Sequence, residues 1–208
     1  METPVLTRRR LLAAGISAAG LTLGAALWVR HRQAAASPPN EFEFCVLAPL
    51  QVNDPASGLG LLQARPIPAD ARCPVCGMFP ARTPEWAAQV IFDDGATQFF
   101  DSPVSMLIYL MDVGRFARGR RDTEVAARLV RDSRGSRAQP GDWIDAMRAV
   151  FVMGSNALGP MRTGNLPAFA NQAAARDFAR RRGGQCVEFT QIPPALIRQL
   201  DARSHLGH

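Results

Sequence analysis

The clearest chemical feature of the sequence is a group of three sulfur donors near residue 75. Cys73, Cys76 and Met78 lie within the segment Cys-Pro-Val-Cys-Gly-Met at residues 73–78. Thiolate and thioether ligands select soft ions, Cu(I) above all, over hard cations that prefer oxygen. On an extended strand, the Cys-x-Met spacing places the Cys76 and Met78 side chains on one side of the chain. These residues therefore predict a Cu(I) site in which Cys73 has a secondary role.

Two further methionines are candidate ligands for the same ion. Met161, in a Gly-Pro-Met segment, lies in a glycine-rich loop of a second predicted unit, and packing of the two units would bring it to the sulfur donors. Met106, at the start of the first predicted helix, is the competing candidate. A single methionine is more often core filler than ligand, and this applies more strongly to Met106.

The same cysteine pair fits other chemistries. A Cys-x-x-Cys pair also occurs in zinc sites, redox dithiols and disulfides. Zinc would need two more Cys or His ligands, and the three histidines lie near the chain ends (His31, His205 and His208). A thioredoxin-type dithiol would open a helix, whereas Gly-Met-Phe-Pro follows Cys76. A thiol–disulfide oxidoreductase acting through Cys73 and Cys76 is therefore kept as the alternative function.

The residues after the cysteines predict a strand–strand–helix unit. Residues 86–92 and 96–100 are two strands, and Asp-Asp-Gly at 93–95 supplies the positive φ of a hairpin turn. Asp-Ser-Pro at 101–103 starts a helix, because it combines a capping side chain with a proline in the first turn. Apolar residues at helical spacing extend this helix to about Met111.

A second unit of the same order follows. Residues 144–153 are strand-like, and a short strand is expected near Ala168. Asn171 is suited to cap a helix that runs to Arg182, and a further strand is expected at 185–190. Two such units predict an α+β fold, packed as one small domain with helices against antiparallel sheet.

The chain divides into four predicted segments: an N-terminal signal or anchor (1–36), a linker with short strands (37–72), a metal-binding domain (73–192) and a C-terminal tail (193–208). The metal-binding domain contains an Arg-rich insert (115–141). The linker strands are expected near 42–47 and 60–65. The insert is expected to be an exposed, partly extended excursion. Two questions stay open: whether Cys45 pairs with Cys186, and whether the tail histidines bind metal.

The first 36 residues have the pattern of an export signal. Thr7 precedes three arginines, and an uncharged apolar run of 19 residues covers 11–29. This arrangement resembles a twin-arginine signal. The run is also close to the roughly 20 residues that cross a bilayer, so cleavage and anchoring through 11–29 both stay open. In either case the sequence predicts an exported, periplasmic domain.

The charge is concentrated at the N-terminus. The 208-residue chain has a net charge of +6 and contains arginine but no lysine. Beyond residue 36 the net charge is only +2. Such a domain has little capacity to displace counterions from phosphates, which argues against nucleic-acid binding. Docking of an acidic partner by Arg118, Arg120 and Arg121 is a further alternative.

Three motifs, in order, resemble the NosL family. They are Cys-Gly-Met at 76–78, Asp-Ser-Pro at 101–103 and Gly-Pro-Met at 159–161, within longer similar segments at 73–78, 88–110 and 151–184. The resemblance covers more than half of the chain, from Cys73 to Phe189.

The resemblance implies a monomeric, non-enzymatic Cu(I) chaperone of the bacterial periplasm that helps to load nitrous oxide reductase during denitrification. It places Cys76 and Met78 in the copper site, with Met161 as the third ligand. A protein that donates copper to the chain is a further implied partner. Family members are commonly lipoproteins, whereas this chain has no cysteine placed for acylation, which leaves its membrane attachment open.

Overall fold

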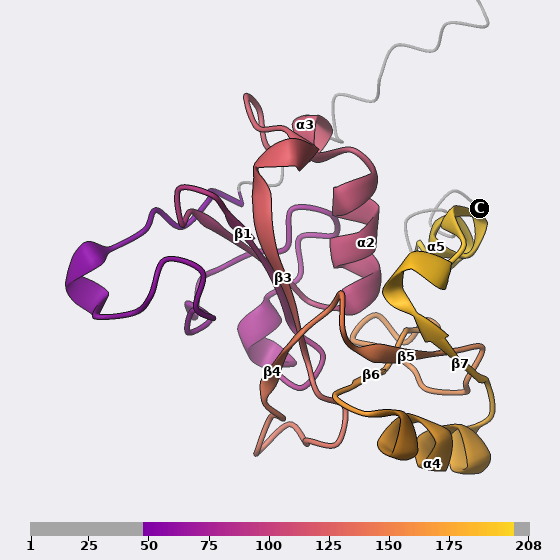
Figure 1. Cartoon of the computed structure of the whole chain (residues 1–208). Coiled ribbons are helices and arrows are strands. Elements are labelled where there is room, and N and C mark those ends of the chain that lie inside the picture. The colour runs from indigo at the N-terminus through magenta and orange to yellow at the C-terminus, as the bar shows by residue number, and fades with distance from the viewer. Residues whose placement is uncertain (1–47, 202–208) are drawn as a thin grey trace, which may run out of the picture. The chain divides into compact units, whose positions relative to one another are not determined.

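The computed structural model describes residues 48–201, which lie within one compact unit (Figure 1). The predicted strand at 42–47, the signal or anchor at 11–29, Cys45 and the tail histidines lie outside the described residues. Within 48–201 no helix is both long enough and apolar enough to span a bilayer.

The predicted hairpin is confirmed. Strands β1 (Ala88–Phe92) and β2 (Thr97–Phe100) pair antiparallel, with Ala88 opposite Phe100. Residues 93–95 form the turn, in which Gly95 has φ +80°. The Gly95 N–H donates to the Phe92 carbonyl, and the Phe92 N–H donates to the Ala96 carbonyl. Glycine provides the positive φ without a steric cost.

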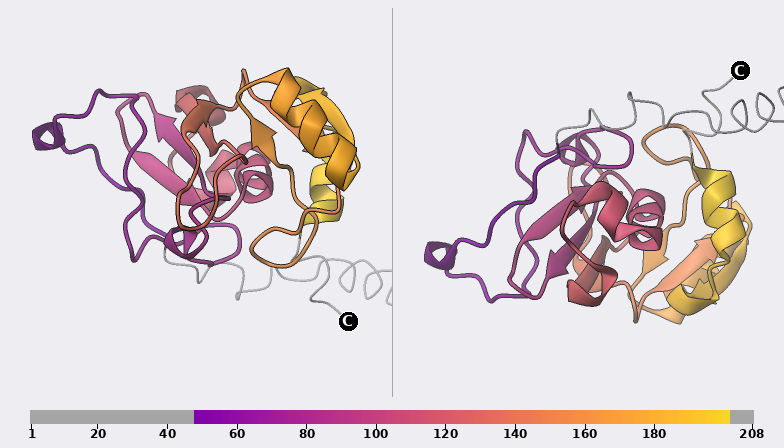
Figure 2. Two further views of the ribbon diagram at one scale, coloured as in Figure 1. Left: turned by 90° about the horizontal axis from the view of Figure 1, so that it is seen from below. Right: turned by 90° about the horizontal axis from the view of Figure 1, so that it is seen from above.

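The predicted helix is also confirmed. Helix α2 (Pro103–Met111) starts at the expected cap, where the Ser102 side chain accepts a hydrogen bond from the Ser105 N–H and Pro103 occupies the first turn. A short helix α3 (Val113–Phe116) follows directly. Figure 2 shows α2 between the strands of the first sheet and the elements of the second unit.

The expectation of an exposed excursion at 115–141 is wrong. After the 3-10 helix η4 (Asp122–Glu124), strand β3 (Val125–Arg131) pairs with β1, and β4 (Trp143–Asp145) pairs with β3. The sheet has the order β2-β1-β3-β4. The arginines concealed the strand because only Val125 and Val130 of β3 are fully buried, while the residues between them are exposed or half-buried.

The second unit contains β5 (Val150–Met153), β6 (Ala168–Phe169), α4 (Gln172–Arg182) and β7 (Gln185–Glu188). The single strand expected at 144–153 is divided into β4 and β5, which belong to different sheets. The second sheet has the order β6-β5-β7. The cap at Asn171 is confirmed, because its side chain accepts a hydrogen bond from the Ala174 N–H. Each unit therefore contains the order strand–strand–helix–strand, with its first strand between the other two, and β4 adds an edge strand to the first sheet.

Side chains of β5 alternate between two hydrophobic layers. Phe151 and Met153 face the main core, which also contains side chains of β1 and α2. Val150 and Val152 pack in a smaller cluster with Phe178 of α4. Alternate residues of a strand point to opposite faces, so the second sheet lies between the main core and α4 (Figure 1).

The N-terminal arm (residues 48–65), drawn in indigo in Figure 1, covers the face of the first sheet that is opposite α2. It contains η2 (Pro55–Ser57), and a single bridge joins Gln51 to Thr97 of β2. The strand expected at 60–65 is wrong, because this segment is a turn. The buried Gln89 side chain is satisfied by the backbone of Arg65, which donates to Gln89 at 2.9 Å and accepts from it at 3.3 Å.

The expectation of a C-terminal tail at 193–208 is wrong for residues 194–200, which form a helix. The 3-10 helix η5 (Phe189–Gln191) leads into helix α5 (Pro194–Leu200), whose Ile197 is buried in the main core. Helix α5 packs against α2.

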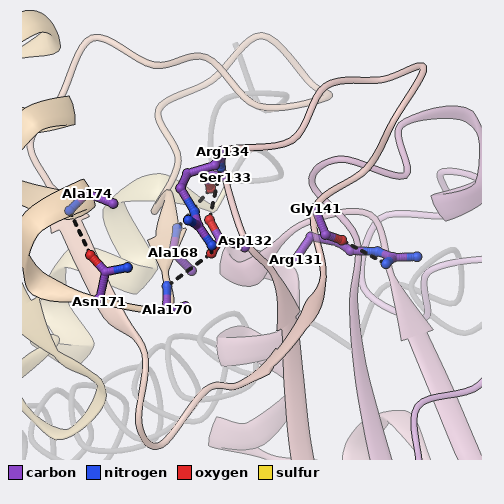
Figure 3. Close-up of polar contacts among 9 residues, drawn as sticks. All are labelled: Arg131, Asp132, Ser133, Arg134, Gly141, Ala168, Ala170, Asn171 and Ala174. Carbon is purple, nitrogen blue, oxygen red and sulfur yellow. Dashed lines mark hydrogen bonds and ion pairs between the residues drawn. The ribbon is translucent and has the colours of Figure 1, made fainter.

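A polar junction ties the two sheets together (Figure 3). Asp132, directly after β3, is buried and accepts hydrogen bonds from the Arg134 guanidinium and from the Ala170 N–H after β6. The Ser133 N–H donates to the Ala168 carbonyl, and the Ala168 N–H donates to the Ser133 hydroxyl. The two units are therefore joined by backbone pairing as well as by the core.

Candidate metal centre

The sulfur-bearing segment is a turn and not the expected extended strand. The Cys73 N–H donates to the Met78 carbonyl at 2.8 Å, and the Gly77 N–H donates to the Cys73 carbonyl at 2.9 Å. Gly77 has φ +75°, a conformation in which glycine is favoured. The strand argument that placed the Cys76 and Met78 side chains on one side is therefore wrong, and the turn instead places the Met78 backbone beside Cys76.

Three elements meet at Cys76. Its Sγ donates a hydrogen bond to Asp101 Oδ1 at 3.2 Å, and the Ser105 hydroxyl lies 4.0 Å from the same sulfur. Asp101 follows β2 directly, and Ser105 belongs to the first turn of α2. One ligand atom each from Cys73, Cys76 and Asp101 lie within 4.8 Å of one another. The end of the hairpin and the start of the helix thus position the groups around the cysteine turn.

The surroundings keep Cys76 protonated in the absence of a cation. The hydrogen bond with the Cys73 side chain, burial, and negative charge on Cys73 and Asp101 raise the pKa of the Cys76 thiol well above its ordinary value, and the Met78 backbone N–H lowers it by less. A soft cation that binds this sulfur would replace its proton.

Cys76 and Met161 line the same pocket, together with Asp101 and Ser105 from the first unit. Cys73 is fully buried and is not part of the pocket wall. Packing of the two units thus brings Met161 to the pocket, as the sequence predicted. Its role as a ligand stays a prediction.

A tight hairpin holds Met161 at its tip. The Gly159 N–H donates to the Thr163 carbonyl at 2.8 Å, and the Arg162 N–H donates to the Gly159 carbonyl at 2.9 Å. Arg162 has φ +58° and is the non-glycine residue with a positive φ among residues 48–201. A side chain at Gly159 would meet the buried Asn165 amide, with its Cβ 2.2 Å from Nδ2. Asn165 therefore packs directly against the base of this turn.

The other sulfur residues lie elsewhere. Met78 is half-buried, and its side chain is not part of the pocket wall. Met106 is fully buried in the main core, which is the packing environment of a core methionine. Cys73, Cys76 and Cys186 are free thiols, and Cys186 packs against α4, in the smaller hydrophobic cluster.

Sequence reasoning missed the part that Asp101 and Ser105 have in this site. It treated the Asp-Ser-Pro segment only as a helix start. The available signal was the position of the Asp101 carboxylate, directly after an apolar strand and before a helix cap. At such a position the end of a strand and the start of a helix lie side by side.

Comparison with known proteins agrees with this fold. A family model described as NosL matches residues 64–197. The copper-binding lipoprotein NosL of Stutzerimonas stutzeri is 26% identical over 135 residues, which cover 65% of this chain and 68% of that protein. The crystal structure of the copper chaperone NosL from Shewanella denitrificans has a TM-score of 0.56 and 25% identity, and the match covers 64% of this chain and 98% of that one. The predicted α+β fold and the resemblance are confirmed: this chain belongs to the NosL family.

Proposed function

We propose that this protein is a non-enzymatic Cu(I) chaperone that carries monovalent copper at the pocket lined by Cys76 and Met161. The observation that supports the proposal most is the convergence of a thiol and a thioether, from two separate units, on one pocket. Membership of the NosL family supports it further, because the two relatives described above are a copper-binding lipoprotein and a copper chaperone.

The donor atoms suit this cargo. The Cys76 thiolate and the Met161 thioether are soft ligands that favour Cu(I) over oxygen-preferring cations. Met78 is the candidate third donor, because its backbone is hydrogen-bonded to Cys76. The buried Cys73 lies behind Cys76 and acts as a secondary donor.

Asp101 serves the cargo site without being a preferred Cu(I) ligand. It accepts the Cys76 hydrogen bond at 3.2 Å and thereby orients the sulfur. When copper replaces the thiol proton, a thiolate and a monovalent cation sum to zero charge. The loaded site therefore adds no charge beyond that of Asp101.

A site with few protein ligands suits transfer. A closed cage of four thiolates would hold copper too firmly to exchange, whereas two or three sulfurs at a pocket leave an approach for an incoming ligand. We therefore propose delivery to a copper enzyme outside the cytoplasm, nitrous oxide reductase being the client that the resemblance implies. Uptake from a copper donor protein would use the same open side, and export would follow the signal-like N-terminus.

Cu(I) titration of the reduced chain under anaerobic conditions tests the proposal. Competition with bathocuproine disulfonate is expected to give one Cu(I) per chain. Binding should be abolished by Cys76→Ser and weakened on the order of tenfold or more by Met161→Leu. Met147→Leu changes an exposed methionine outside the pocket and serves as the matched control. Unchanged affinity in both Cys76→Ser and Met161→Leu would refute the proposed cargo site.

Thiol–disulfide exchange is the second candidate function, because the two Cys-x-x-Cys sulfurs are within reach of each other. However, a nucleophilic cysteine needs an accessible, stabilised thiolate. Here Cys73 is buried and the pKa of Cys76 is raised. An insulin-reduction assay on the wild type and Cys73→Ser distinguishes the two functions, since the chaperone proposal expects no reductase activity in either.

A further inference from the structure

Two exposed arginines are held beside the cysteine turn. The Arg72 guanidinium donates to the carbonyl of Gly77, between Cys76 and Met78, at 3.3 Å. Arg72 and Arg82 both place their guanidinium carbons over the ring of Phe79, at 4.2 and 4.3 Å from its centroid. Such cation–π contacts restrain the two side chains while their charges stay in solvent. The turn that contains Cys76 is therefore flanked by two fixed positive charges.

A third exposed arginine lies on the other contributing loop. Arg162 stands between Met161 and Thr163, which both line the pocket. It occupies the left-handed position of the hairpin, which costs a non-glycine residue about 1–2 kcal/mol. We call Arg72, Arg82 and Arg162 the arginine rim.

Several arginines elsewhere on the surface form intramolecular ion pairs. Ion pairs join Arg120 and Arg121 to Glu124, Arg134 to Asp132, Arg148 to Asp145, and both Arg180 and Arg181 to Asp177. The docking surface expected at Arg118, Arg120 and Arg121 thus loses two of its three charges to intramolecular pairs. In the described part of the chain, no residue of the arginine rim forms an ion pair. The rim charges are therefore available to a partner.

We propose that the arginine rim docks an acidic surface of the protein that exchanges copper with this chain. The inference rests on the proposed chaperone function and identifies the chemistry of its partner. Because a thiolate and Cu(I) cancel in charge, the rim stays positive when the site is loaded. Charges around a site raise the rate of encounter with an oppositely charged partner and orient it. The rim thus selects a partner whose copper ligands are surrounded by Asp and Glu.

Two synthetic acceptor peptides test the proposal. Both carry a Cys-x-x-Cys copper site and a fluorophore that copper quenches, but one is flanked by glutamates and the other by glutamines. The Cu(I)-loaded full chain is expected to load the glutamate peptide on the order of tenfold faster at low salt. This preference should vanish at high salt, because salt screens the charges. Equal rates at low salt would overturn the proposal.

Charge reversal locates the effect on the surface. The triple variant Arg72→Glu, Arg82→Glu and Arg162→Glu is expected to prefer the glutamine peptide. A triple variant with the same net charge, Arg118→Glu, Arg137→Glu and Arg176→Glu, changes exposed arginines away from the pocket and should keep the wild-type preference. If both triples lose the preference equally, net charge and not the rim is responsible, and the proposal fails. The glutamine triple Arg72→Gln, Arg82→Gln and Arg162→Gln, with Cu(I) affinity measured in parallel, provides a milder variant if the reversed one does not fold.

A copper-free measurement separates this inference from the proposed function. Fluorescence anisotropy of the glutamate peptide with the apo chain reports docking directly, even if the chain binds no Cu(I). Rim-dependent binding to phosphatidylglycerol vesicles without binding to the glutamate peptide would instead assign the rim to a membrane surface and overturn the proposal.

Discussion

The two strand–strand–helix–strand units share one topology but differ in the loop between their first two strands. In the first unit the four residues 93–96 connect β1 to β2. In the second, the long segment 154–167 connects β5 to β6 and contains a small hairpin of its own. Both turns have the same pair of hydrogen bonds, but Gly95 occupies the positive-φ position in one and Arg162 in the other. The unit with the extended loop supplies Met161 to the pocket, whereas the unit with the short turn supplies Asp101 and Ser105.

The two units also differ in how deeply their elements are buried. Every residue of β1 and β2 is buried, because the arm covers one face of the first sheet and α2 the other. In α4 of the second unit, Ala175 is the fully buried residue. The first unit should therefore dominate the stability of the fold, and the second should tolerate change.

Truncation of one phenylalanine in each unit tests this difference and should have the largest effect. Phe100 is fully buried and contacts Tyr109 edge-on, with ring centroids 5.0 Å apart. Phe100→Ala is expected to lower the free energy of unfolding by roughly 3–5 kcal/mol. Phe178→Ala removes a half-buried ring from α4 and should cost about 1–2 kcal/mol. Urea unfolding measures both, and equal losses would contradict the ranking of the units.

The junction between the units should have the next largest effect. Asp132→Asn removes the charge that accepts hydrogen bonds from Arg134 and Ala170, and we expect a loss of about 2 kcal/mol in urea unfolding near neutral pH. Asp145→Asn is the matched control, because Asp145 is half-exposed, and its ion pair with Arg148 should contribute under about 1 kcal/mol. A loss in Asp132→Asn no larger than in the control would show that the junction does not hold the units together.

The same carboxylate predicts a pH dependence. Burial alone would raise the pKa of Asp132, but hydrogen bonds from Arg134 and Ala170 outweigh it and hold the pKa below the ordinary value. A lowered folded-state pKa means that the stabilisation is complete above about pH 4, the unfolded-state pKa, and is lost as the pH falls through the folded-state pKa. The difference in unfolding free energy between wild type and Asp132→Asn should therefore shrink below about pH 4. A constant difference down to that range and beyond would contradict the assignment.

The hairpin of the first unit and both helix caps could be predicted because their chemistry is local. Asp-Asp-Gly, Ser-Pro and Asn each specify a backbone conformation without reference to the rest of the chain. The prediction of an extended strand at the cysteines was wrong, because Pro74 and Gly77 are turn residues and Gly77 adopts a positive φ. Strand β3 could not be found in the same way, because Arg128 and other incompletely buried residues separate its two buried valines and Arg131 ends it, which hides the alternation.

The candidate site could be predicted from the sequence only in part, for a different reason. Cys76 was identifiable by its type, since few residues match its chemistry. The approach of Met161 depends on packing between units, and the sequence offered it as an inference from topology. Asp101 was missed because a carboxylate is not a soft ligand, and its contact with Cys76 follows from where β2 ends. Donor type can thus be read locally, whereas the neighbours that orient a donor are set by tertiary structure.

A side chain added at Gly95 tests how closely the N-terminal arm packs against the first turn. Gly95→Ala places a Cβ at φ +80°, 2.7 Å from Leu61 Cδ1 of the arm. We expect a loss of about 1–2 kcal/mol from the backbone conformation alone, with the contact adding to it. Gly119→Ala is the control, because Gly119 has φ +81° with nothing within 4 Å of the added Cβ. Equal losses in urea unfolding would show that the arm yields to the new side chain.

The smallest effect, with the opposite sign, is expected at the matching position of the second turn. Arg162→Gly relieves a left-handed arginine, a gain of about 1–2 kcal/mol, against about 0.4–1 kcal/mol of extra entropy in the unfolded chain. The net result should be a stabilisation of about 0.5 kcal/mol, measured by urea unfolding. Arg137→Gly, at a position without a positive φ, should instead be slightly destabilising. Cu(I) affinity should not change, because the hydrogen bonds that form the Met161 turn are made by backbone atoms. A loss of stability in Arg162→Gly as large as in Arg137→Gly would mean that the Arg162 side chain contributes contacts that offset its strain.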